Sequence, residues 1–339
     1  MTFLIAVVML GLIIFVHELG HFLTAKLFKM PVSEFSIGMG PQVFSVDTKN
    51  TAYSFRAIPI GGYVNIEGME VGSEVENGFS SKPAYQRFVV LFAGVFMNFL
   101  MAFILLFAVA KINGRIEYDT NAIIGGLVKG GANEQILKVD DKILELDGKK
   151  INVWTDISKI TKASQNKEEI SALIERNGKE ENITLKLTKD EENNRVVLGI
   201  SPKYKKINLS ATESLDFAKN SFNSIFTDTL KGFFTLFSGK ASLKEISGPV
   251  GIFKVVGEVS KFGWVSIISL YVVLSINIGV LNLLPIPALD GGRILFVLLE
   301  LFGIKVNKKW EEKLHKGGMI LLLFFILMIS VNDVWKLFN

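Results

Sequence analysis

Four apolar runs, each close to the length of a membrane-spanning helix, constrain this chain more than any other feature. They occupy residues 1–25, 88–110, 264–285 and 317–338. A helix needs about 20 apolar residues to cross the hydrocarbon core of a bilayer. Residues 289–302 are also apolar but too short to cross, so we expect a partly embedded helix there. The sequence therefore predicts a polytopic α-helical membrane protein with about four transmembrane helices.

The positions of Lys and Arg predict how these helices are oriented. No basic residue precedes Lys26, so the first run lacks the basic start of a secretory signal and we expect it to be retained. Basic residues concentrate in the loops 26–87 and 286–316, and the positive-inside rule places such loops in the cytoplasm. The long stretch 111–263 should then lie outside, as in a multi-pass protein of the bacterial inner (cytoplasmic) membrane.

Charge and cysteine content exclude two kinds of site. The net charge of +4 arises from 37 basic and 33 acidic residues that alternate along the chain. No basic stripe therefore predicts binding of nucleic acid. Without cysteine there is neither a disulfide framework nor a thiolate metal site. Any zinc site must be built from carboxylates and the 3 histidines.

The pattern H-E-x-x-H occurs at residues 17–21, inside the first apolar run. On a helix His17 and His21 lie one turn apart on one face and can bind the same metal ion. Glu18 beside them can act as a general base. A charged residue at the centre of a span costs about 2.5 to 3.5 kcal/mol on insertion scales, so ionisable groups at this depth indicate function. The alternative is a cluster that is solvated beside Lys26 and binds no metal.

A third ligand is required, because catalytic zinc usually has three protein ligands and one open position. Asp290 follows Pro285 and Pro287 at the end of the third run, where two prolines are expected to break the helix and line a site. The alternative is a simple turn in which Asp290 accepts backbone hydrogen bonds. His315 lies among lysines, and we interpret it as a surface histidine.

Two asparagines near this break are candidates for contact with a substrate. The amide of Asn282 is a candidate donor to the oxyanion that forms from a substrate carbonyl. Asn277, one to two turns earlier, is a candidate to support Asn282. Both assignments require that the amides face the metal site.

These motifs together resemble the site-2 protease family of intramembrane zinc metalloproteases, and most closely its bacterial regulators of sigma-E. The resemblance rests on residues 17–21 (HELGH) and 282–292 (NLLPIPALDGG), and extends to 92–98 (FAGVFMN) and 247–252 (SGPVGI). It implies one Zn²⁺ per chain, held by His17, His21 and Asp290, with Glu18 activating a water molecule.

The resemblance also implies a substrate class, and the sequence around His21 indicates a position for the site. The substrates would be transmembrane segments of single-pass proteins, namely anti-sigma factors already trimmed outside or remnant signal peptides, cleaved in regulated intramembrane proteolysis. Because Lys26 follows His21 by about one turn, we expect the active site near the cytoplasmic side, where water reaches it.

Residues 121–204 are polar and β-prone, and they resemble a PDZ domain around residues 137–148. Asp140 and Asp141 indicate a turn before a strand, and the Asp-Gly pair at 147–148 indicates a hairpin. A PDZ domain adds an extended peptide to a sheet edge, so peptide termini are the expected partners of this extracytoplasmic α+β insertion. A folded domain without a peptide ligand is the alternative. Better-known sigma-E-type members carry two tandem PDZ domains, and this segment has room for one.

Two further segments lie between the halves of the protease core, which we place at residues 1–110 and 264–339. Residues 205–263 predict amphipathic helices on the membrane surface, or helices packed against the outer domain. Residues 53–66 predict two strands joined by a glycine turn. In this membrane-associated β-hairpin Gly61, Gly62 and Tyr63 would present an unwound substrate as an added strand. A cytosolic hairpin resting on lipid headgroups is the alternative.

The sequence thus predicts an intramembrane zinc endopeptidase, with two alternatives from other classes. One is a catalytically silent membrane scaffold that binds exported peptides through its outer domain. The other is a metal transporter that uses the same ligands. A change at Glu18 separates the protease from both alternatives, because only proteolysis needs a general base.

Overall fold

The chain divides into two units in a computed structural model. One unit comprises Met1–Val109 and Ala211–Asn339, and the other comprises Ala110–Ser210. The structure describes residues 2–69, 75–118, 121–190, 195–239, 248–304 and 306–338. The smaller unit is therefore an insertion between the two halves of the larger one.

Within the described ranges, 4 helices of the larger unit are long and apolar enough to cross a membrane. They are α1 (Thr2–Leu27), α2 (Ala84–Asn113), α6 (Trp264–Leu283) and residues Lys308–Asp333 of α8 (Lys308–Phe338). By helix length and composition, the predicted number of spans is confirmed. Both α2 and α8 begin earlier than the apolar runs, since polar first turns extend them.

Residues that interrupt helical hydrogen bonding end these helices. Lys29 adopts a left-handed conformation (φ +55°) just after α1 and precedes Pro31, a common way for a helix to stop. α6 ends at Leu283, because Pro285 lacks the N–H that would continue the helix. The chain is then irregular until α7 (Asp290–Leu301), the short helix expected over residues 289–302.

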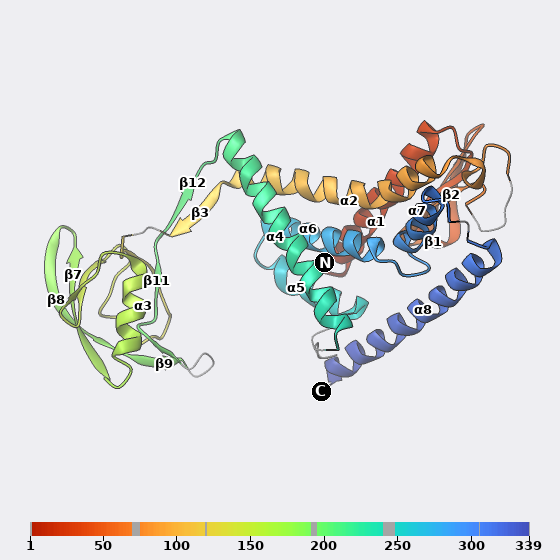
Figure 1. The fold of residues 1–339 in the computed structure, drawn as a ribbon. Coiled ribbons are helices and arrows are strands. Elements are labelled where there is room, and N and C mark those ends of the chain that lie inside the picture. The colour runs from red at the N-terminus through yellow and green to blue at the C-terminus, as the bar shows by residue number, and fades with distance from the viewer. Residues whose placement is uncertain are drawn as a thin grey trace. The chain divides into compact units, whose positions relative to one another are not determined.

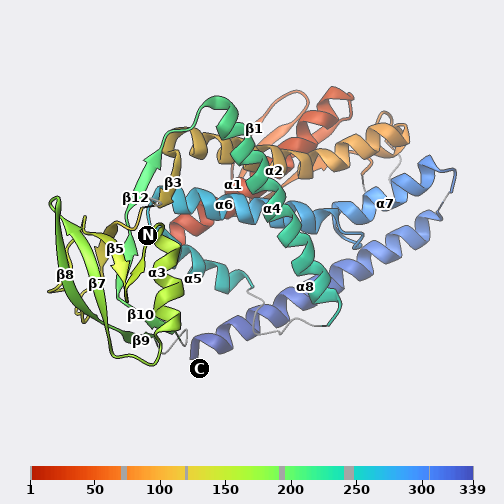
Figure 2. The same cartoon turned by 60° about the vertical axis from the view of Figure 1, so that its left-hand side comes forward.

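The helices α1, α2 and α6 pack against one another in the larger unit (Figures 1 and 2). Small residues allow their backbones to approach closely. A Cβ atom on Gly20 would lie 2.3 Å from the carbonyl oxygen of Ala93, and one on Gly279 would lie 2.4 Å from the Phe99 ring. In a bilayer, van der Waals packing at such contacts is a main source of helix association.

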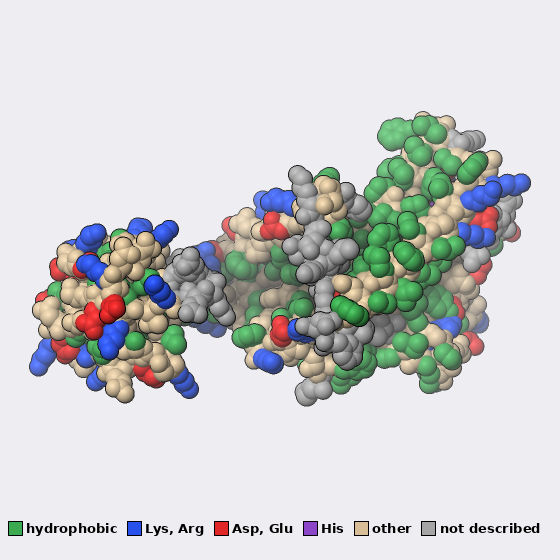
Figure 3. All heavy atoms as spheres, turned by 90° about the horizontal axis from the view of Figure 1, so that it is seen from below, with side chains coloured by type: hydrophobic (Ala, Val, Ile, Leu, Met, Phe, Trp, Pro, Cys, Tyr) green, Lys and Arg blue, Asp and Glu red, His purple; other side chains and the backbone are tan. Residues whose placement is uncertain are grey.

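α8 differs from the other candidate spans in its surroundings. Only 6% of its spanning window is buried inside the protein, against 39% for α1 and for α2. Its exposed side chains include Leu321, Leu323, Phe324 and Leu327. Figure 3 shows hydrophobic side chains gathered broadly over one face of the larger unit. A face of this kind suits contact with lipid acyl chains.

The segment between α1 and α2 forms an antiparallel pair, β1 (Val32–Asp47) and β2 (Ala52–Ile66). The pair is folded on itself, because Phe35 of β1 lies opposite Val64 on one side and opposite Tyr53 on the other.

Two glycines with positive φ, Gly38 (+88°) and Gly61 (+94°), permit the bends in these strands. The predicted turn within residues 53–66 is therefore wrong in detail, since 52–66 form one bent strand paired with 32–47. Alternation within a segment shows that it is a strand but does not identify its partner.

The predicted helices of residues 205–263 are α4 (Ala211–Phe237) and α5 (Pro249–Ser260). Residues 205–207 were expected to begin this stretch, but they belong to a strand, β12 (Tyr204–Ile207). α4 packs Phe222 and Phe226 edge-on against Phe99 of α2. At the start of α5 the backbone N–H of Gly251 donates to Asp333 of α8 at 2.8 Å. A location of α4 on the membrane surface stays a prediction.

The smaller unit is built around a four-stranded sheet with the order β6-β5-β7-β8. Its strands are β5 (Lys142–Leu146), β6 (Lys149–Lys150), β7 (Glu169–Arg176) and β8 (Lys179–Lys186), accompanied by α3 (Trp154–Ala163). Three short pairs complete the unit: β3 (Arg115–Tyr118) with β12, β4 (Ile124–Leu127) with β11 (Ile200–Pro202), and β9 (Thr188–Asp190) with β10 (Arg195–Val197).

Two sequence predictions for this unit are confirmed. Asp147 (φ +54°) and Gly148 (φ +71°) form the turn between β5 and β6, with the positive φ values of a tight hairpin turn. Residues 139–140 form a turn before β5. Asp141, 2% exposed, accepts hydrogen bonds from Arg176 at 2.6 and 2.8 Å. The hydrogen bonds to Asp141 raise the pKa of the Arg176 guanidinium.

Candidate metal centre

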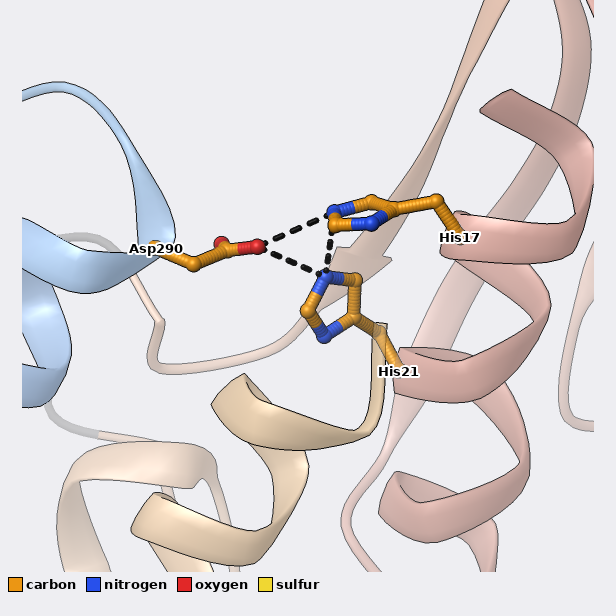
Figure 4. Close-up of side chains that lie close together, drawn as sticks. All are labelled: His17, His21 and Asp290. Atoms are coloured by element: carbon orange, nitrogen blue, oxygen red, sulfur yellow. Dashed lines mark hydrogen bonds and ion pairs between the residues drawn. The ribbon is translucent and has the colours of Figure 1, made fainter. Parts of the chain in front are cut away.

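His17, His21 and Asp290 converge on one point inside the larger unit (Figure 4). The Nε2 atom of His17 lies 3.0 Å from Oδ2 of Asp290 and 3.1 Å from Nε2 of His21. The Nε2 atom of His21 lies 3.3 Å from the same carboxylate oxygen. Both imidazoles are buried, and three candidate ligand atoms therefore form a nearly equilateral triangle.

The dimensions of this triangle fit zinc. Zinc binds histidine nitrogen and carboxylate oxygen at about 2.0 to 2.2 Å, so neighbouring ligand atoms of a tetrahedral site lie about 3.3 to 3.5 Å apart. The three observed separations of 3.0, 3.1 and 3.3 Å need only a small expansion to reach these values. A triangle also leaves one tetrahedral position open, as a catalytic site requires.

Two different local structures position the candidate ligands. His17 and His21 are one turn apart on α1, which is continuous through the motif. Asp290 is the first residue of α7 and follows an irregular segment in which Ala288 has a φ of +83°. A positive φ is unfavourable for a residue with a side chain, so the surrounding structure must hold this segment in place.

The helix α2 supplies hydrogen-bond partners behind both histidines. The carbonyl oxygen of Val90 lies 2.8 Å from Nδ1 of His21 and can accept its proton, which leaves Nε2 free for a metal. Asn98, fully buried, places its amide 3.5 Å from Nδ1 of His17. The Asn98 Oδ1 has no partner among the described residues. Turning the amide by 180° lets that oxygen accept the Nδ1 proton of His17.

Gly94 brings α2 close enough to provide these partners. A Cβ atom at this position would lie 2.4 Å from Nε2 of His21 and 2.9 Å from Cε1 of His17. The position therefore tolerates glycine alone without a shift of the imidazoles. Gly94 and Asn98 belong to the motif at 92–98, but the sequence did not indicate that they face the histidines.

Glu18 joins the metal centre to the β-pair. Its Oε2 accepts a hydrogen bond from the backbone N–H of Val64 in β2 at 3.1 Å. The candidate base thus lies beside the candidate substrate-presenting residues, because Val64 directly follows Tyr63. The pairing holds one carboxylate oxygen and leaves the other available for a proton.

The candidate presenting residues are placed as follows. Gly61 lies at the bend in β2 and Gly62 lies opposite Ile37 of β1. The Tyr63 hydroxyl donates to Glu34 at 2.5 Å and accepts from Arg56 at 2.5 Å. Its side chain therefore stabilises the β-pair.

The polar cluster around Tyr63 shifts the ionisation of Glu34. Burial opposes ionisation of this carboxyl group, but hydrogen bonds from Ser54, Tyr63 and Arg56 outweigh burial and lower the pKa of Glu34. Glu34 therefore accepts these hydrogen bonds as a carboxylate at neutral pH.

The two candidate asparagines of α6 have different surroundings. Asn277 accepts a hydrogen bond from the Thr229 hydroxyl of α4 at 2.6 Å, so it links two helices. Asn282 is half-buried in the last turn of α6, and its amide has no protein partner among the described residues. Asn282 therefore has free donors for a substrate, whereas the side-chain oxygen of Asn277 is engaged with α4.

The interpretation of His315 as a surface histidine is wrong. Its side chain is buried, and its Nδ1 accepts a hydrogen bond from the backbone N–H of Ala288 at 3.1 Å. The lysines around it in the sequence point elsewhere on α8, because only one face of the helix packs on the protein.

Comparison with known proteins establishes the family. The model of peptidase family M50 matches residues 5–325, and the chain belongs to this family. The chain is 92% identical, over all of both sequences, to a Fusobacterium nucleatum protein named "Putative zinc metalloprotease FN1322". It is 27% identical to the "Regulator of sigma-W protease RasP" of Bacillus subtilis, with 99% of each chain covered.

A solved structure resembles part of the chain. A PDZ domain of an SdrC-like protein from Listeria monocytogenes matches 25% of this chain and 90% of its own, with 15% identity and a TM-score of 0.23. The family assignment rests on the sequence matches alone. The protein is a zinc metalloprotease of the site-2 protease family with helices that can span a membrane, as the sequence predicted.

Proposed function

We propose that the protein is an intramembrane endopeptidase that hydrolyses transmembrane segments of single-pass membrane proteins. One observation carries the proposal: two histidines of a candidate spanning helix and Asp290 form a triangle with the dimensions of a zinc site, and Glu18 follows His17 on the same helix. Candidate substrates are anti-sigma factors already cut outside the membrane and remnant signal peptides, in regulated intramembrane proteolysis.

His17, His21 and Asp290 would hold the zinc. When bound, the metal polarises the scissile carbonyl and makes water a nucleophile at neutral pH. Glu18 takes the proton from the attacking water and delivers it to the leaving amine. The Val64 N–H fixes the orientation of the Glu18 carboxylate during this transfer. The free amide of Asn282 is the candidate donor to the carbonyl oxygen as negative charge develops.

The edge of β2 is the candidate surface for an unwound substrate. A transmembrane helix must be extended before its backbone reaches the metal, and strand addition stabilises an extended peptide. Val64 directs its N–H away from β1 and toward Glu18. Alternate residues of a strand direct their backbone groups to the same edge, so Gly62 would offer its N–H and C=O to a peptide beside Glu18.

The smaller unit contains a candidate site for peptide termini. A cavity of about 420 Å³ lies between α3 and the β10–β11 region, lined by Trp154, Ile157, Thr161 and Lys162 and by Val196 and Leu198. Apolar walls suit a terminal side chain, and Lys162 suits a carboxylate. We place this PDZ-like unit outside the cytoplasmic membrane and the metal centre near the cytoplasmic side.

Replacement of Glu18 by Gln tests the proposed function. Cleavage of a membrane-embedded reporter should fall by about 10² to 10⁴-fold, because the general base is lost, while zinc content stays at the wild-type level. Glu180→Gln, at an exposed position of the small unit, is the matched control and should cleave normally. Undiminished cleavage by the Glu18 variant would refute the mechanism. Metal uptake that persists in that variant would favour a transporter.

A further inference from the structure

His315 is the third histidine of the chain, and the proposed mechanism gives it no role. It lies in the first turns of α8, 9% exposed, with its ring 5.6 Å from the Phe296 ring of α7. Its Nδ1 accepts the hydrogen bond from the backbone N–H of Ala288 at 3.1 Å. Nδ1 can accept only when the proton of the neutral ring is on Nε2.

The segment that His315 contacts leads directly into Asp290. Within residues 285–289 the prolines have no N–H, and the N–H groups of Ile286 and Leu289 donate to backbone carbonyls of Leu284 and Ile286. The N–H of Ala288 is the remaining donor of this segment, and His315 is its acceptor. Ala288 also carries the unfavourable φ of +83°, so the contact falls at the residue most in need of support.

The same face of α8 supports the segment through a second contact. A Cβ atom on Gly318, three residues after His315, would lie 2.5 Å from the carbonyl oxygen of Pro287. On the other side, a Cβ atom on Gly291 would lie 2.2 Å from the carbonyl oxygen of Leu284. The segment is therefore enclosed between α8 and the first turn of α7, and a shift of Ala288 must displace Asp290.

We infer that His315 is a positioning residue that holds the 285–289 segment so that the Asp290 carboxylate reaches the metal. The inference rests on Asp290 being a zinc ligand, as in the proposed function. His315 acts through a backbone hydrogen bond and does not touch the metal itself. Groups that orient metal ligands in this indirect way typically change metal affinity by 10- to 100-fold when they are lost.

Three substitutions at one position test the acceptor role. In His315→Asn the Oδ1 atom occupies nearly the place of Nδ1 and can accept the Ala288 N–H. His315→Gln carries its polar atoms one bond further, and His315→Leu has none. Leu314→Asn, at the exposed neighbouring position, is the control for polar substitution in α8.

The measurement is the zinc dissociation constant of the purified full chain, by competition with a chromogenic chelator. We expect wild-type affinity within about threefold for His315→Asn and Leu314→Asn. For His315→Leu and His315→Gln we expect a loss of about 10- to 100-fold. The visible spectrum of the Co²⁺-substituted protein should change in the same two variants, because the carboxylate ligand is displaced. Thermal unfolding of the metal-free variants shows whether each of them folds.

Three outcomes overturn the inference. Wild-type zinc affinity in His315→Leu would show that the hydrogen bond does not position Asp290. Equal losses in His315→Asn and His315→Leu would show that the imidazole itself is needed. If His315→Leu does not fold, wild-type affinity in His315→Gln is the overturning result. Asp290→Ala distinguishes a failure of this inference from a failure of the proposed function. Unchanged zinc affinity in that variant would refute Asp290 as a ligand.

Discussion

Replacing Gly94 with alanine should disable the metal centre through a single methyl group. The new Cβ would lie 2.4 Å from Nε2 of His21, the atom that would bind the metal. A comfortable contact between carbon and nitrogen is about 3.4 Å, so the imidazole or the helix must move by about 1 Å. The backbone cannot easily yield, since a Cβ on Gly20 would already lie 2.3 Å from Ala93, next to Gly94.

A displacement of that size exceeds what a zinc site tolerates, because ligand distances are held within about 0.2 Å of their ideal values. We therefore expect Gly94→Ala to weaken zinc binding by at least 100-fold. Overpacking should also cost about 1 to 3 kcal/mol of stability. Zinc affinity by chelator competition and unfolding of the metal-free protein measure these two effects separately.

Gly317→Ala is the matched control, because a Cβ at Gly317 of α8 meets no atom within 4 Å. It should leave zinc affinity unchanged and stabilise the helix by about 0.5 to 1 kcal/mol. Wild-type zinc affinity in Gly94→Ala would refute the close approach of α2 to the histidines.

Three further predictions concern groups outside the ligand triangle. Asn98→Leu should weaken zinc binding by about 10- to 100-fold, because it removes the hydrogen-bond partner of His17. Asn98→Asp keeps an acceptor oxygen and should retain most of the zinc affinity. Equal losses in the two variants would contradict an acceptor role for Asn98. Arg176→Leu should destabilise the smaller unit by about 3 to 5 kcal/mol, because Asp141 is left buried and unpaired; hydrogen exchange of β5 and β7 in the full chain measures the loss, and unchanged protection would contradict it. Glu34 has a lowered pKa in the folded protein, so its contribution to stability is present above its ordinary value of 4.5 and is lost as pH falls below it. Glu34→Gln should remove this pH dependence from thermal unfolding of the full chain, and a curve parallel to wild type would contradict that role.

In the proposed mechanism, the strand edge that binds the substrate and the general base lie at the same place in the fold. Val64 links the strand edge to Glu18, so a peptide added at Gly62 would arrive beside the proton acceptor. α2 packs closely against α1 beside the two histidines, and Asp290 at the start of α7 approaches their Nε2 atoms. The proposed reaction would therefore take place between α1, β2 and the start of α7.

Local information in the sequence determined much of this protein. Helix length and hydropathy were enough to predict four helices that can span a membrane, because a bilayer requires continuous apolar runs. The spacing of His17 and His21 was enough to predict that they share a face of α1. The Asp147-Gly148 pair was enough to predict a hairpin in the smaller unit.

Tertiary structure decided whatever depends on residues far apart in the chain. Asp290 meets His17 across 273 positions, and Asn98 meets it across 81. Periodicity places a residue on a face of its own helix but does not name the element packed on that face. For the same reason His315, surrounded by lysines in the sequence, was misassigned to the surface although it is buried against the segment that carries Asp290.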